Sequence, residues 1–523
     1  MQSTPARPKN GRARLRAAIE NLETRQMLSS YFIDTDTAYA ALNSKTLAAG
    51  DVVLLKGGTT FHGELYLDAS DKGTAANPIV IGSYDPTTGL QLSADAPASA
   101  RATISSGSSD GIFAYNTGGL TISNVNVLGS GASKNSANGI EFYTDLSGNT
   151  RLKGVTIDHV DVSGYGNNGV VLGSGAAGTG YDGARITYVT AHDNGMTGVT
   201  TYGVAQSGTL EHSNLYVGHV SAFNNGGFAG LSTPSGSGIL LSDVDGATIE
   251  YSKAYGNGAN QTNAHGGLGI WVWDANNVVI QYNESYSNLS RGGDGGGFDL
   301  DGGVTNSVMQ YNYAHDNAGA GFGLFEYSDA SPFHDNICRD NVSVNNGLHN
   351  NAGEIVLWSV GSNIYNTQVY GNTLVADSAS KGIEFWTSNI TADVHDNTVL
   401  IGTTAAAVGV DVSMWTGTPV ATTTPVTTDP TAVASTTDSS SSSSTSTSTS
   451  TSTSTSTDTT TTDPTTVANT TPTSTTTDDS TSTDTTDTGS TVSCAPSTTS
   501  TTTTTSTRTK VARVKKHHGR SAA

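Results

Sequence analysis

Cysteine, basic residues and charge in general are scarce in this sequence. Its 523 residues include 2 cysteines, 24 lysines and arginines, and 45 aspartates and glutamates, and only 13% of all residues are charged. Cys338 and Cys494 lie in very different contexts and make no disulfide framework. Because binding to phosphate needs clustered basic side chains, the excess of acids argues against nucleic acid as a partner.

Long apolar runs are also missing. No segment approaches the roughly 20 apolar residues that cross a bilayer, and the start lacks the apolar core of about 7 to 15 residues found in an ordinary signal peptide. The stretch LETRQML at residues 22–28 instead resembles the LEPR-XLL leader of exported planctomycete surface proteins, with Thr24 in place of proline and Met27 in place of leucine. The resemblance implies an extracellular or cell-surface location, and we expect no transmembrane segment.

Composition divides the chain into four parts. Residues 1–30 form a basic leader, residues 31–416 a domain of varied composition, residues 417–507 a stretch dominated by Ser and Thr, and residues 508–523 a second basic segment. The Ser/Thr-rich stretch has almost nothing apolar to bury, so we expect a disordered stalk. The basic tail then either binds an anionic wall or membrane by charge or is a solvated terminus.

Repeats of about thirty residues run through residues 31–416. Segments such as ITYVTAHDNG, IEYSKAYGNG and IQYNESYSNL overlay on one another. Alternating β-branched residues, with Gly or Asn at the corners, favour one coil of a solenoid of short strands. In such coils like side chains stack about 4.8 Å apart, so we predict an asparagine ladder in the second half of the series. The fourth position of the repeat is occupied by Val125, Val160, Val189, Val220, Ser252, Asn283, Asn312, Asn341, Asn372 and Asn397.

The repeat resembles right-handed parallel β-helix proteins of the pectate-lyase type. The segment TDTAYAALNSKTLAAGDVVLLKGGTTFHGELYLDAS at residues 35–70 is similar to the capping helix and first coils of that group. The resemblance covers about residues 31–416 and implies an all-β solenoid of about ten coils. It implies no single reaction, because this architecture hosts lyases, hydrolases, epimerases and adhesins.

A second strand series occurs once per coil, as in GIWVW, GFDLD, GFGLF and GIEFW. If the residue after the glycine points inward, as for Ile270 and Phe298, the alternate positions point outward. The outward positions that carry aromatic or acidic side chains are Glu141, Tyr143, Trp271, Trp273, Asp299, Asp301, Phe325, Trp358, Glu384 and Trp386, and Glu354 joins them.

Four of the five tryptophans would thus share one outward face. Contiguous exposed aromatic rings usually mark a binding site. Flat rings stack on sugar rings and carboxylates accept hydrogen bonds from hydroxyl groups, so we predict a groove that binds an extended polysaccharide. The alternative is that neighbouring segments cover the rings, which then belong to the core. The predicted binding residues are Trp271, Trp273, Trp358, Trp386, Glu354 and Glu384.

The segment GGFDLDGG places Asp299 and Asp301 on this outward face. Alternate residues of a strand lie about 6.6 Å apart, so this pair, or one of its members with Glu326 or Asp274, fits the two carboxylates of a glycosidase. Together with Asp294, the two aspartates also provide enough oxygen ligands for one calcium ion, the only cofactor that the sequence suggests. A third interpretation is a solvated acidic face without a ligand.

A lyase would also need a base that removes the proton beside a uronate carboxyl. The candidates near the face are Arg291, His265, Lys381 and Tyr327. Residues 31–416 carry 35 acidic and 12 basic side chains, a net charge of −23, which repels a polyanion unless calcium bridges it. We therefore expect a surface or secreted protein that binds and cleaves a polysaccharide as a hydrolase or lyase. The alternative is a non-catalytic adhesin or wall protein.

Overall fold

The computed structural model describes residues 29–204, 208–328, 330–361 and 364–416. The Ser/Thr-rich stalk, the basic tail and nearly all of the leader predicted from the sequence lie outside these residues. Within the described ranges, no helix is both long enough and apolar enough to cross a membrane.

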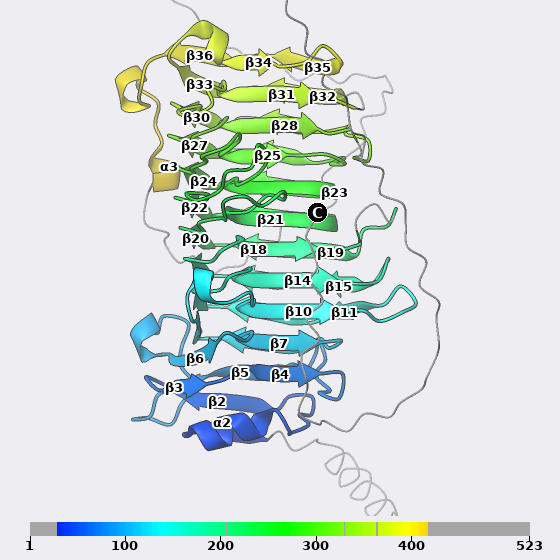
Figure 1. Cartoon of the computed structure of the whole chain (residues 1–523), viewed down its shortest axis with the longest axis vertical. Coiled ribbons are helices and arrows are strands. Elements are labelled where there is room, and N and C mark those ends of the chain that lie inside the picture. The colour runs from blue at the N-terminus through cyan, green and yellow to red at the C-terminus, as the bar shows by residue number, and fades with distance from the viewer. Residues whose placement is uncertain (1–28, 205–207, 329, 362–363, 417–523) are drawn as a thin grey trace, which may run out of the picture. The chain divides into compact units, whose positions relative to one another are not determined.

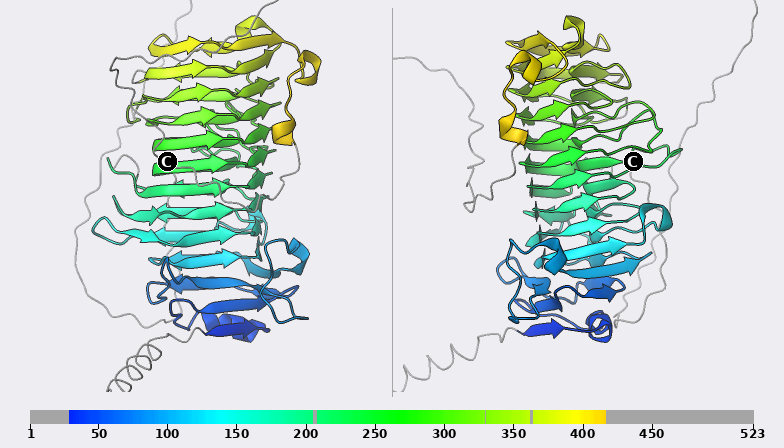
Figure 2. Two further views of the ribbon diagram at one scale, coloured as in Figure 1. Left: turned by 180° about the vertical axis from the view of Figure 1, so that it is seen from behind. Right: turned by 90° about the vertical axis from the view of Figure 1, so that its left-hand side faces the viewer.

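The described chain is a parallel β-helix, as the sequence predicts. Its strands form a 24-stranded sheet, which carries two stacks of strands, and a 12-stranded sheet, which carries a third. Successive coils pair in parallel in all three stacks. Figure 1 shows the stacks from one side, and Figure 2 shows them from behind and from the edge. Parallel strands connected in this way follow a right-handed course in nearly all proteins.

Each turn of the chain contributes short strands to each stack. The first stack contains β4 (Leu65–Asp68), β7 (Ile112–Tyr115), β10 (Ile140–Thr144), β14 (Val170–Ser174), β18 (Thr197–Tyr202), β21 (Ser237–Glu250), β23 (Ile270–Gln281), β25 (Phe298–Leu300), β28 (Phe322–Glu326), β31 (Ile355–Ser359) and β34 (Ile383–Phe385). The second stack contains β1 (Ser30–Ile33), β2 (Val52–Lys56), β5 (Ile79–Tyr84), β8 (Leu120–Ser123), β11 (Arg151–Lys153), β12 (Val155–Asp158), β15 (Gly180–Asp182), β16 (Arg185–Thr187), β19 (His212–Gly218), β26 (Val308–Gln310), β29 (Ile337–Arg339), β32 (Ile364–Tyr370) and β35 (Ile390–His395), and the long strands β21 and β23 continue through it.

The 12-stranded sheet contains one strand from each coil. Its strands are β3 (Thr60–His62), β6 (Ala102–Gly107), β9 (Val125–Gly129), β13 (Asp161–Ser163), β17 (Thr190–His192), β20 (Ser221–Phe223), β22 (Lys253–Tyr255), β24 (Glu284–Tyr286), β27 (Tyr313–His315), β30 (Val342–Val344), β33 (Thr373–Ala376) and β36 (Thr398–Ile401). Ten of them begin at or just after the ten marked repeat positions, and β3 and β6 belong to two earlier coils that lack the marker. The helices are α2 (Asp36–Leu42), α3 (Ser413–Thr416) and the 3-10 helices Ala98–Ala100, Ala132–Lys134, Ala379–Lys381 and Ala406–Val408.

Apolar side chains fill the interior of the coils in ladders. Ile270 pairs with Phe298, and Phe298 pairs with Phe322 on the next coil, and all three are fully buried. Burial of such a side chain stabilises the fold by about 1.5 to 3 kcal/mol. Cys338 occupies an inward position beside Met309 in the second stack. Burial raises the pKa of its thiol to about 12, so Cys338 is a core side chain and not a nucleophile.

Buried asparagines hold adjacent coils together at two corners. Asn283 Nδ2 donates to Asn312 Oδ1 at 3.0 Å, and Asn312 Nδ2 donates to Asn341 Oδ1 at 3.1 Å. The ladder continues through Asn372 to Asn397, which confirms the prediction. A second ladder, which the sequence analysis did not identify, runs through Asn194, Asn225, Asn257, Asn288, Asn317 and Asn346.

Aromatic rings also stack at a corner of the coils. The ring centroids of neighbours in this stack lie 4.5 to 5.4 Å apart. Because the ring faces contact one another, they are not available to a sugar, and we interpret the stack as structural. Its members are His159, Tyr188, His219, Tyr251, Tyr282 and Tyr311.

The end of the described chain returns along the 12-stranded sheet, as the yellow segment in Figure 2 shows. Trp415 in α3 is 8% exposed. Its indole N–H donates to the carbonyl of Tyr311 at 2.8 Å, and its ring centroid lies 5.6 Å from that of Tyr313. This contact fixes residue 415 at the level of β27, in the same coil as β28.

Candidate active site on the outward face of the first stack

The outward face of the first stack carries two neighbouring ladders of side chains. In one ladder, Trp271 pairs with Asp299, and Asp299 pairs with Gly323 on the next coil. In the other, Phe325 pairs with Trp358. The positions between them point inward and are buried. This alternation is the one that the strand pattern predicts.

Two residues assigned to the groove do not reach its surface. Trp271 is only 4% exposed, because its indole turns towards the start of β21 and donates to Ser237 Oγ at 3.1 Å. Glu354 is 3% exposed, and its carboxylate turns into a coil corner. There it accepts hydrogen bonds from the Ser343 hydroxyl at 2.6 Å and from the Asn346 amide at 2.7 Å, so it closes the second asparagine ladder. The structure therefore contradicts a glycan contact for Trp271 and Glu354.

The other aromatic side chains form an accessible patch. Trp386 is 47% exposed, and Trp273, Phe325 and Trp358 are partly exposed. The ring centroid of Phe325 lies 6.1 Å from that of Trp358, edge to face, and 6.4 Å from that of Trp386, nearly parallel. We call Trp273, Phe325, Trp358 and Trp386 the aromatic patch.

Glu384 orients one ring of the aromatic patch. It accepts a hydrogen bond from the Trp386 indole at 3.0 Å, and it pairs with Lys381 Nζ at 2.9 Å. Burial alone would raise the pKa of Glu384, but the hydrogen bonds from Lys381 and Trp386 leave it below its ordinary value. Glu384 is therefore ionised at neutral pH, and Lys381, a candidate base in the sequence, is engaged with it.

Four carboxylates gather where the chain turns out of the first stack. These are Asp243, Asp274, Asp301 and Glu326, which we call the acidic corner. Burial raises the pKa of the neighbouring Tyr327 phenol, and the charges of all four carboxylates raise it further. The four side chains therefore all lie near the Tyr327 phenol.

Two glycines let these carboxylates approach one turn of the backbone. The Gly303 N–H donates to Glu326 Oε2 at 3.5 Å, and a Cβ on Gly303 would lie 3.2 Å from Asp274 Oδ1. The Asp274 N–H donates to the Gly302 carbonyl at 2.8 Å, and the Gly302 N–H donates to Asp301 Oδ1 at 2.7 Å. Asp274, through its backbone, and Asp301, through its side chain, thus both bond to Gly302.

Asp299 lies beneath the aromatic patch and not in the open groove. It is fully buried, and neither of its carboxylate oxygens has a hydrogen-bond partner. A Cβ on Gly323 would lie 2.7 Å from Asp299 Oδ1 and 3.0 Å from the Phe325 ring, so this carboxylate fills the space that the glycine leaves. Glu326 is also fully buried, and its Oε1 has no partner. Direct contact with a substrate is therefore contradicted for Asp299 and Glu326, whereas Asp301 is partly exposed.

Burial shifts the proton affinities of these carboxylates. It raises the pKa of Asp301 to about 7. Burial also raises the pKa of Glu326 to about 7, and the charge of Asp301 contributes to this shift. In the same way, burial raises the pKa of Asp243 to about 7. Burial, followed by the charge of Asp301, raises the pKa of Asp299 well above its ordinary value. Because desolvation disfavours the charged form, Asp301, Glu326 and Asp243 exchange protons near neutral pH.

We expect the melting temperature to fall as the pH rises through neutrality. An acid whose pKa is raised by folding stabilises the fold below its ordinary pKa, and this contribution is lost as the pH rises through its folded pKa. Asp301, Glu326 and Asp243 have folded pKa values of about 7. The melting temperature, followed by circular dichroism, should therefore fall as the pH rises from about 4, near the ordinary pKa of these groups, to about 7. The Asp301→Asn, Glu326→Gln double variant should decline less, and an unchanged slope would contradict the raised pKa values.

Arg291 and the expected calcium ligands do not assemble. Arg291 is exposed, and within the described residues it forms no ion pair with Asp294, Asp299 or Asp301. Asp294 instead accepts a hydrogen bond from the Gly266 N–H at 3.0 Å. In the part of the chain that the structure describes, no group of three or more His, Cys, Asp or Glu side chains is arranged to hold a metal ion. The geometry therefore gives the calcium hypothesis no support.

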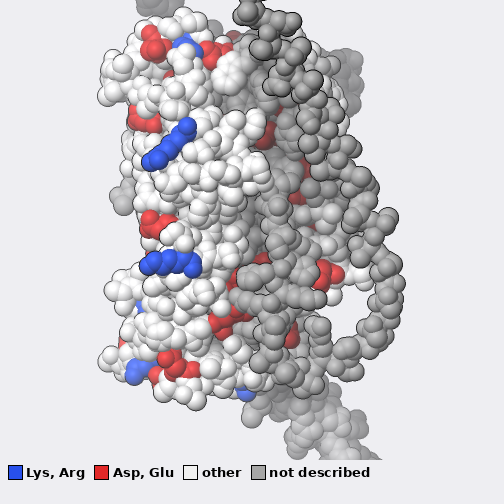
Figure 3. Space-filling view, viewed as in Figure 1, with Lys and Arg blue, Asp and Glu red and all other residues white. Residues whose placement is uncertain are grey.

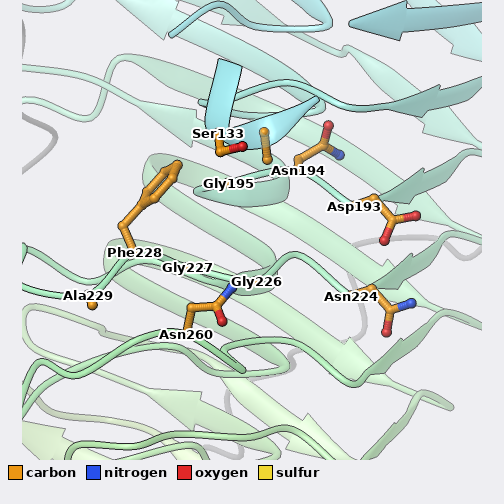
Figure 4. A pocket seen from close by; sticks show the side chains of 11 residues that line it. Ser133, Asp193, Asn194, Gly195, Asn224, Gly226, Gly227, Phe228, Ala229 and Asn260 are labelled. Carbon is orange, nitrogen blue, oxygen red and sulfur yellow. The ribbon is translucent and has the colours of Figure 1, made fainter. Parts of the chain in front are cut away.

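A pocket of about 420 Å³ lies elsewhere, at the corners near β17 and β20 (Figure 4). Phe228, Asn224 and Asn260 line it together with Asp193, whose carboxylate lies 2.6 Å from His192 Nδ1. The pocket therefore has one carboxylate, which already pairs with a histidine, and it cannot provide both the acid and the base of a reaction.

Figure 3 shows few lysine and arginine side chains on the described surface of the face seen in Figure 1. We therefore place the candidate active site at the acidic corner.

Comparison with known proteins agrees with the architecture. No protein-family model matches the chain, and no curated protein matches it closely enough in sequence to count as a relative. A solved structure of a GH136 lacto-N-biosidase from Eubacterium ramulus is similar to it, with 17% identity, a TM-score of 0.52, and coverage of 74% of this chain and 70% of that one. This likeness shows the fold.

Two further solved structures match less closely. The A-module of a mannuronan C-5 epimerase from Azotobacter vinelandii is 15% identical with a TM-score of 0.43, over 72% of this chain and 97% of that one. An alginate lyase from Paenibacillus sp. is 15% identical with a TM-score of 0.36, over 72% of this chain and 98% of that one. These two likenesses carry no argument about this chain, and its reaction has to be argued from the site.

Proposed function

We propose that this protein hydrolyses an extended neutral polysaccharide at the acidic corner. The observation that carries the proposal is that Asp301 and Asp274, from adjacent coils, both bond to Gly302 at the acidic corner. Asp301 is partly exposed and has a pKa of about 7, so it holds a proton over a large part of the neutral range. Glycoside hydrolysis needs one protonated and one ionised carboxyl group beside the scissile bond.

The proposed reaction assigns one role to each carboxyl group. Asp301 donates its proton to the glycosidic oxygen as the bond to the sugar carbon breaks. Asp274 takes a proton from the attacking water, and the water oxygen becomes the new hydroxyl of the sugar. Burial, with a contribution from the charge of Asp294, favours the protonated form of Asp301, and the buried Glu326 and Asp299 act as positioning residues beside it.

The charges around the corner favour hydrolysis of a neutral glycan over a lyase reaction. A lyase must stabilise the negative charge that develops on a uronate carboxyl, and a cation or metal usually does so. Within the described residues, no lysine, arginine or histidine forms an ion pair with Asp301, Glu326 or Asp243. The net charge of −23 on residues 31–416 would also repel a polyanion.

A second candidate function is glycan binding without catalysis at a cell surface. Three observations favour it: the resemblance of residues 22–28 to an export leader, the Ser/Thr-rich stretch after residue 416, and the burial of Glu326 and Asp299. In both candidates the protein acts outside the cell or on its surface. The two candidate functions differ only in whether the bound glycan is cleaved.

A screen of polysaccharides tests the proposed function. Neutral and uronate polymers would be incubated with the full chain, and products followed by reducing ends and by the ultraviolet absorbance of unsaturated uronates. We expect reducing ends from a neutral polymer without the absorbance signal. Unsaturated products would show lyase chemistry, and binding of a polymer without any product would favour the surface-binding function.

The aromatic patch should supply much of the binding energy for the glycan. Replacing Trp273 and Trp358 by alanine should weaken binding by about 1 to 3 kcal/mol for each ring, the range for aromatic anchors at interfaces. Quenching of the remaining tryptophan fluorescence on titration with the polymer measures the affinity. Tyr251→Ala is the matched control, because Tyr251 is 46% exposed but belongs to the corner stack. An equal loss in the control, or none in the patch variants, would contradict this role.

A further inference from the structure

A second group of aromatic side chains lies on the first stack, on strands that precede the acidic corner. In β4 and β7, the ring centroids of Tyr66 and Phe113 lie 5.8 Å apart. Those of Phe113 and Tyr115 lie 6.1 Å apart, as do those of Tyr115 and Tyr143 in β10. All of these side chains are partly exposed. We call Tyr66, Phe113, Tyr115 and Tyr143 the N-terminal ladder.

The N-terminal ladder lies on the same outward face as the aromatic patch. Its rings alternate along β7 and β10 with fully buried inward residues, Ile112, Ala114, Ile140 and Phe142. Strands β10, β14, β18, β21, β23 and β25 pair in this order (Figure 1). Five steps of about 4.8 Å therefore separate β10 from β25, or roughly 24 Å along the stack. Asp301 directly follows β25.

The spacing of the rings in the N-terminal ladder resembles that of the aromatic patch. Rings of the patch lie 6.1 and 6.4 Å apart, whereas neighbours in the corner stack lie 4.5 to 5.4 Å apart. Rings at the wider spacing are offset from one another, so neighbouring rings do not fully cover each other's faces. The ladder therefore presents ring surface of the kind that stacks on a sugar.

Carboxylates border the N-terminal ladder. The Tyr115 hydroxyl donates to Asp145 Oδ1 at 2.8 Å. The Tyr202 hydroxyl lies 3.5 Å from Glu141 Oε1, and its ring lies over Gly173, where a Cβ would be 2.3 Å from it. Within the described residues, neither Glu141 nor Asp145 forms an ion pair with a lysine or arginine. This combination of rings and acidic acceptors suits a neutral glycan and repels a polyanion.

Aromatic side chains thus lie on both sides of Asp301 along the stack. Trp273 and the N-terminal ladder belong to coils before β25, whereas Phe325, Trp358 and Trp386 belong to coils after it. An enzyme that removes sugars from a chain end has to hold the chain on one side of the scissile bond. Contacts on both sides fit a chain that passes across the site.

We propose that the N-terminal ladder binds the same neutral polysaccharide chain as the aromatic patch, so that the chain lies along the first stack and is cut in its interior. Interior cleavage rests on the proposed function, whereas binding to the ladder does not. Two contact areas on one chain reinforce each other, so a polymer that spans both binds more tightly than a fragment that reaches one of them.

Electrophoresis of the full chain in gels that contain a neutral polysaccharide tests the binding. The probes are xyloglucan, galactomannan and mixed-linkage β-glucan, and the slowing of the protein with polymer concentration gives the dissociation constant. The Tyr115→Ala, Tyr143→Ala variant should bind the retarding polymer about tenfold more weakly than the native chain, as for the loss of an aromatic anchor. The Tyr115→Phe, Tyr143→Phe variant keeps both rings and should bind as the native chain does.

The Tyr251→Ala variant is the matched control. Tyr251 is 46% exposed but belongs to the corner stack, so its loss should leave the affinity unchanged. The proposal would be overturned by unchanged affinity in the alanine double variant, by an equal loss in the phenylalanine or Tyr251→Ala variant, or by no slowing of the native chain with any of the three polymers.

The products separate failure of the ladder from failure of the hydrolysis. If the chain is cut in its interior, the viscosity of the bound polymer falls before many reducing ends appear. Release of short sugars alone, with the viscosity unchanged, would overturn interior cleavage. Binding that depends on the ladder but yields no product would contradict the proposed hydrolysis, and interior cleavage with it, and would leave the ladder as a glycan-binding surface.

Discussion

The Asp301→Asn and Asp274→Asn variants should each lower kcat by about 10² to 10⁴-fold, the usual contribution of a positioned acid or base. Asparagine keeps the size and the hydrogen bonding of aspartate but neither donates nor takes a proton. Glycan affinity should change little, because the aromatic patch remains. Initial rates of reducing-end formation at saturating polymer measure the effect, which should appear in kcat and not in KM.

Two controls make this result specific. Asp393→Asn, a loss of one exposed carboxylate far from the corner, should leave kcat unchanged. Glu326→Gln should have a smaller effect than Asp301→Asn and should shift the pH dependence of kcat, because Glu326 is buried and acts through its neighbour. Equal rates for the Asp301→Asn variant and the native chain would remove Asp301 from the mechanism.

The Asn312→Ala variant should lose about 3 to 5 kcal/mol of stability, since each buried group left without a partner costs about 1 to 3 kcal/mol. Asn312 is fully buried. Its Oδ1 accepts from the backbone and side chain of Asn283, and its Nδ2 donates to the Ile280 carbonyl and to Asn341. Alanine removes all four bonds at once and leaves a gap in the ladder.

Urea unfolding followed by circular dichroism measures this loss. Asn260→Ala is the control, because Asn260 is exposed and its backbone N–H bond to Gly226 remains. A surface substitution of this kind changes stability by less than about 0.5 kcal/mol. A loss for Asn312→Ala as small as that of the control would show that the ladder does not hold the coils together.

The sequence predicts the fold well because every coil repeats the same pattern of inward, outward and corner residues. The marker series from Val125 to Asn397 sets the coil length, and each coil stacks its residues on those of the next. The marker series does not count the first two coils, because β3 and β6 lack the marker, although the resemblance of residues 35–70 to a capping helix and first coils covers β3. The second asparagine ladder was visible in the sequence as the recurring asparagine of HDNG, FNNG, YGNG and YSNL, but a period of thirty does not distinguish a buried amide from a turn residue.

The site is only partly predictable from the sequence. The alternation along a strand shows to which side of the sheet a side chain points, but it does not show whether that side chain is exposed to solvent. Trp271 and Glu354 lie at groove positions and are nevertheless buried, since Ser237 and Asn346 on neighbouring elements bond to them. Asp243 was missed because it lies inside the long strand β21, where the chain turns from the first stack to the second with a backbone φ of 56°. Turns of this kind depend on contacts between coils, which no local pattern records.

Hydrolysis in water enriched in ¹⁸O tests the central claim most directly. The polymer that gives reducing ends would be treated with the full chain in labelled water, and the products weighed by mass spectrometry. If Asp301 and Asp274 hydrolyse the glycan, every cleaved bond adds one ¹⁸O atom, and the Asp301→Asn, Asp274→Asn double variant gives no labelled product. Products without the label, or labelled products formed equally well by the double variant, would contradict hydrolysis at the acidic corner.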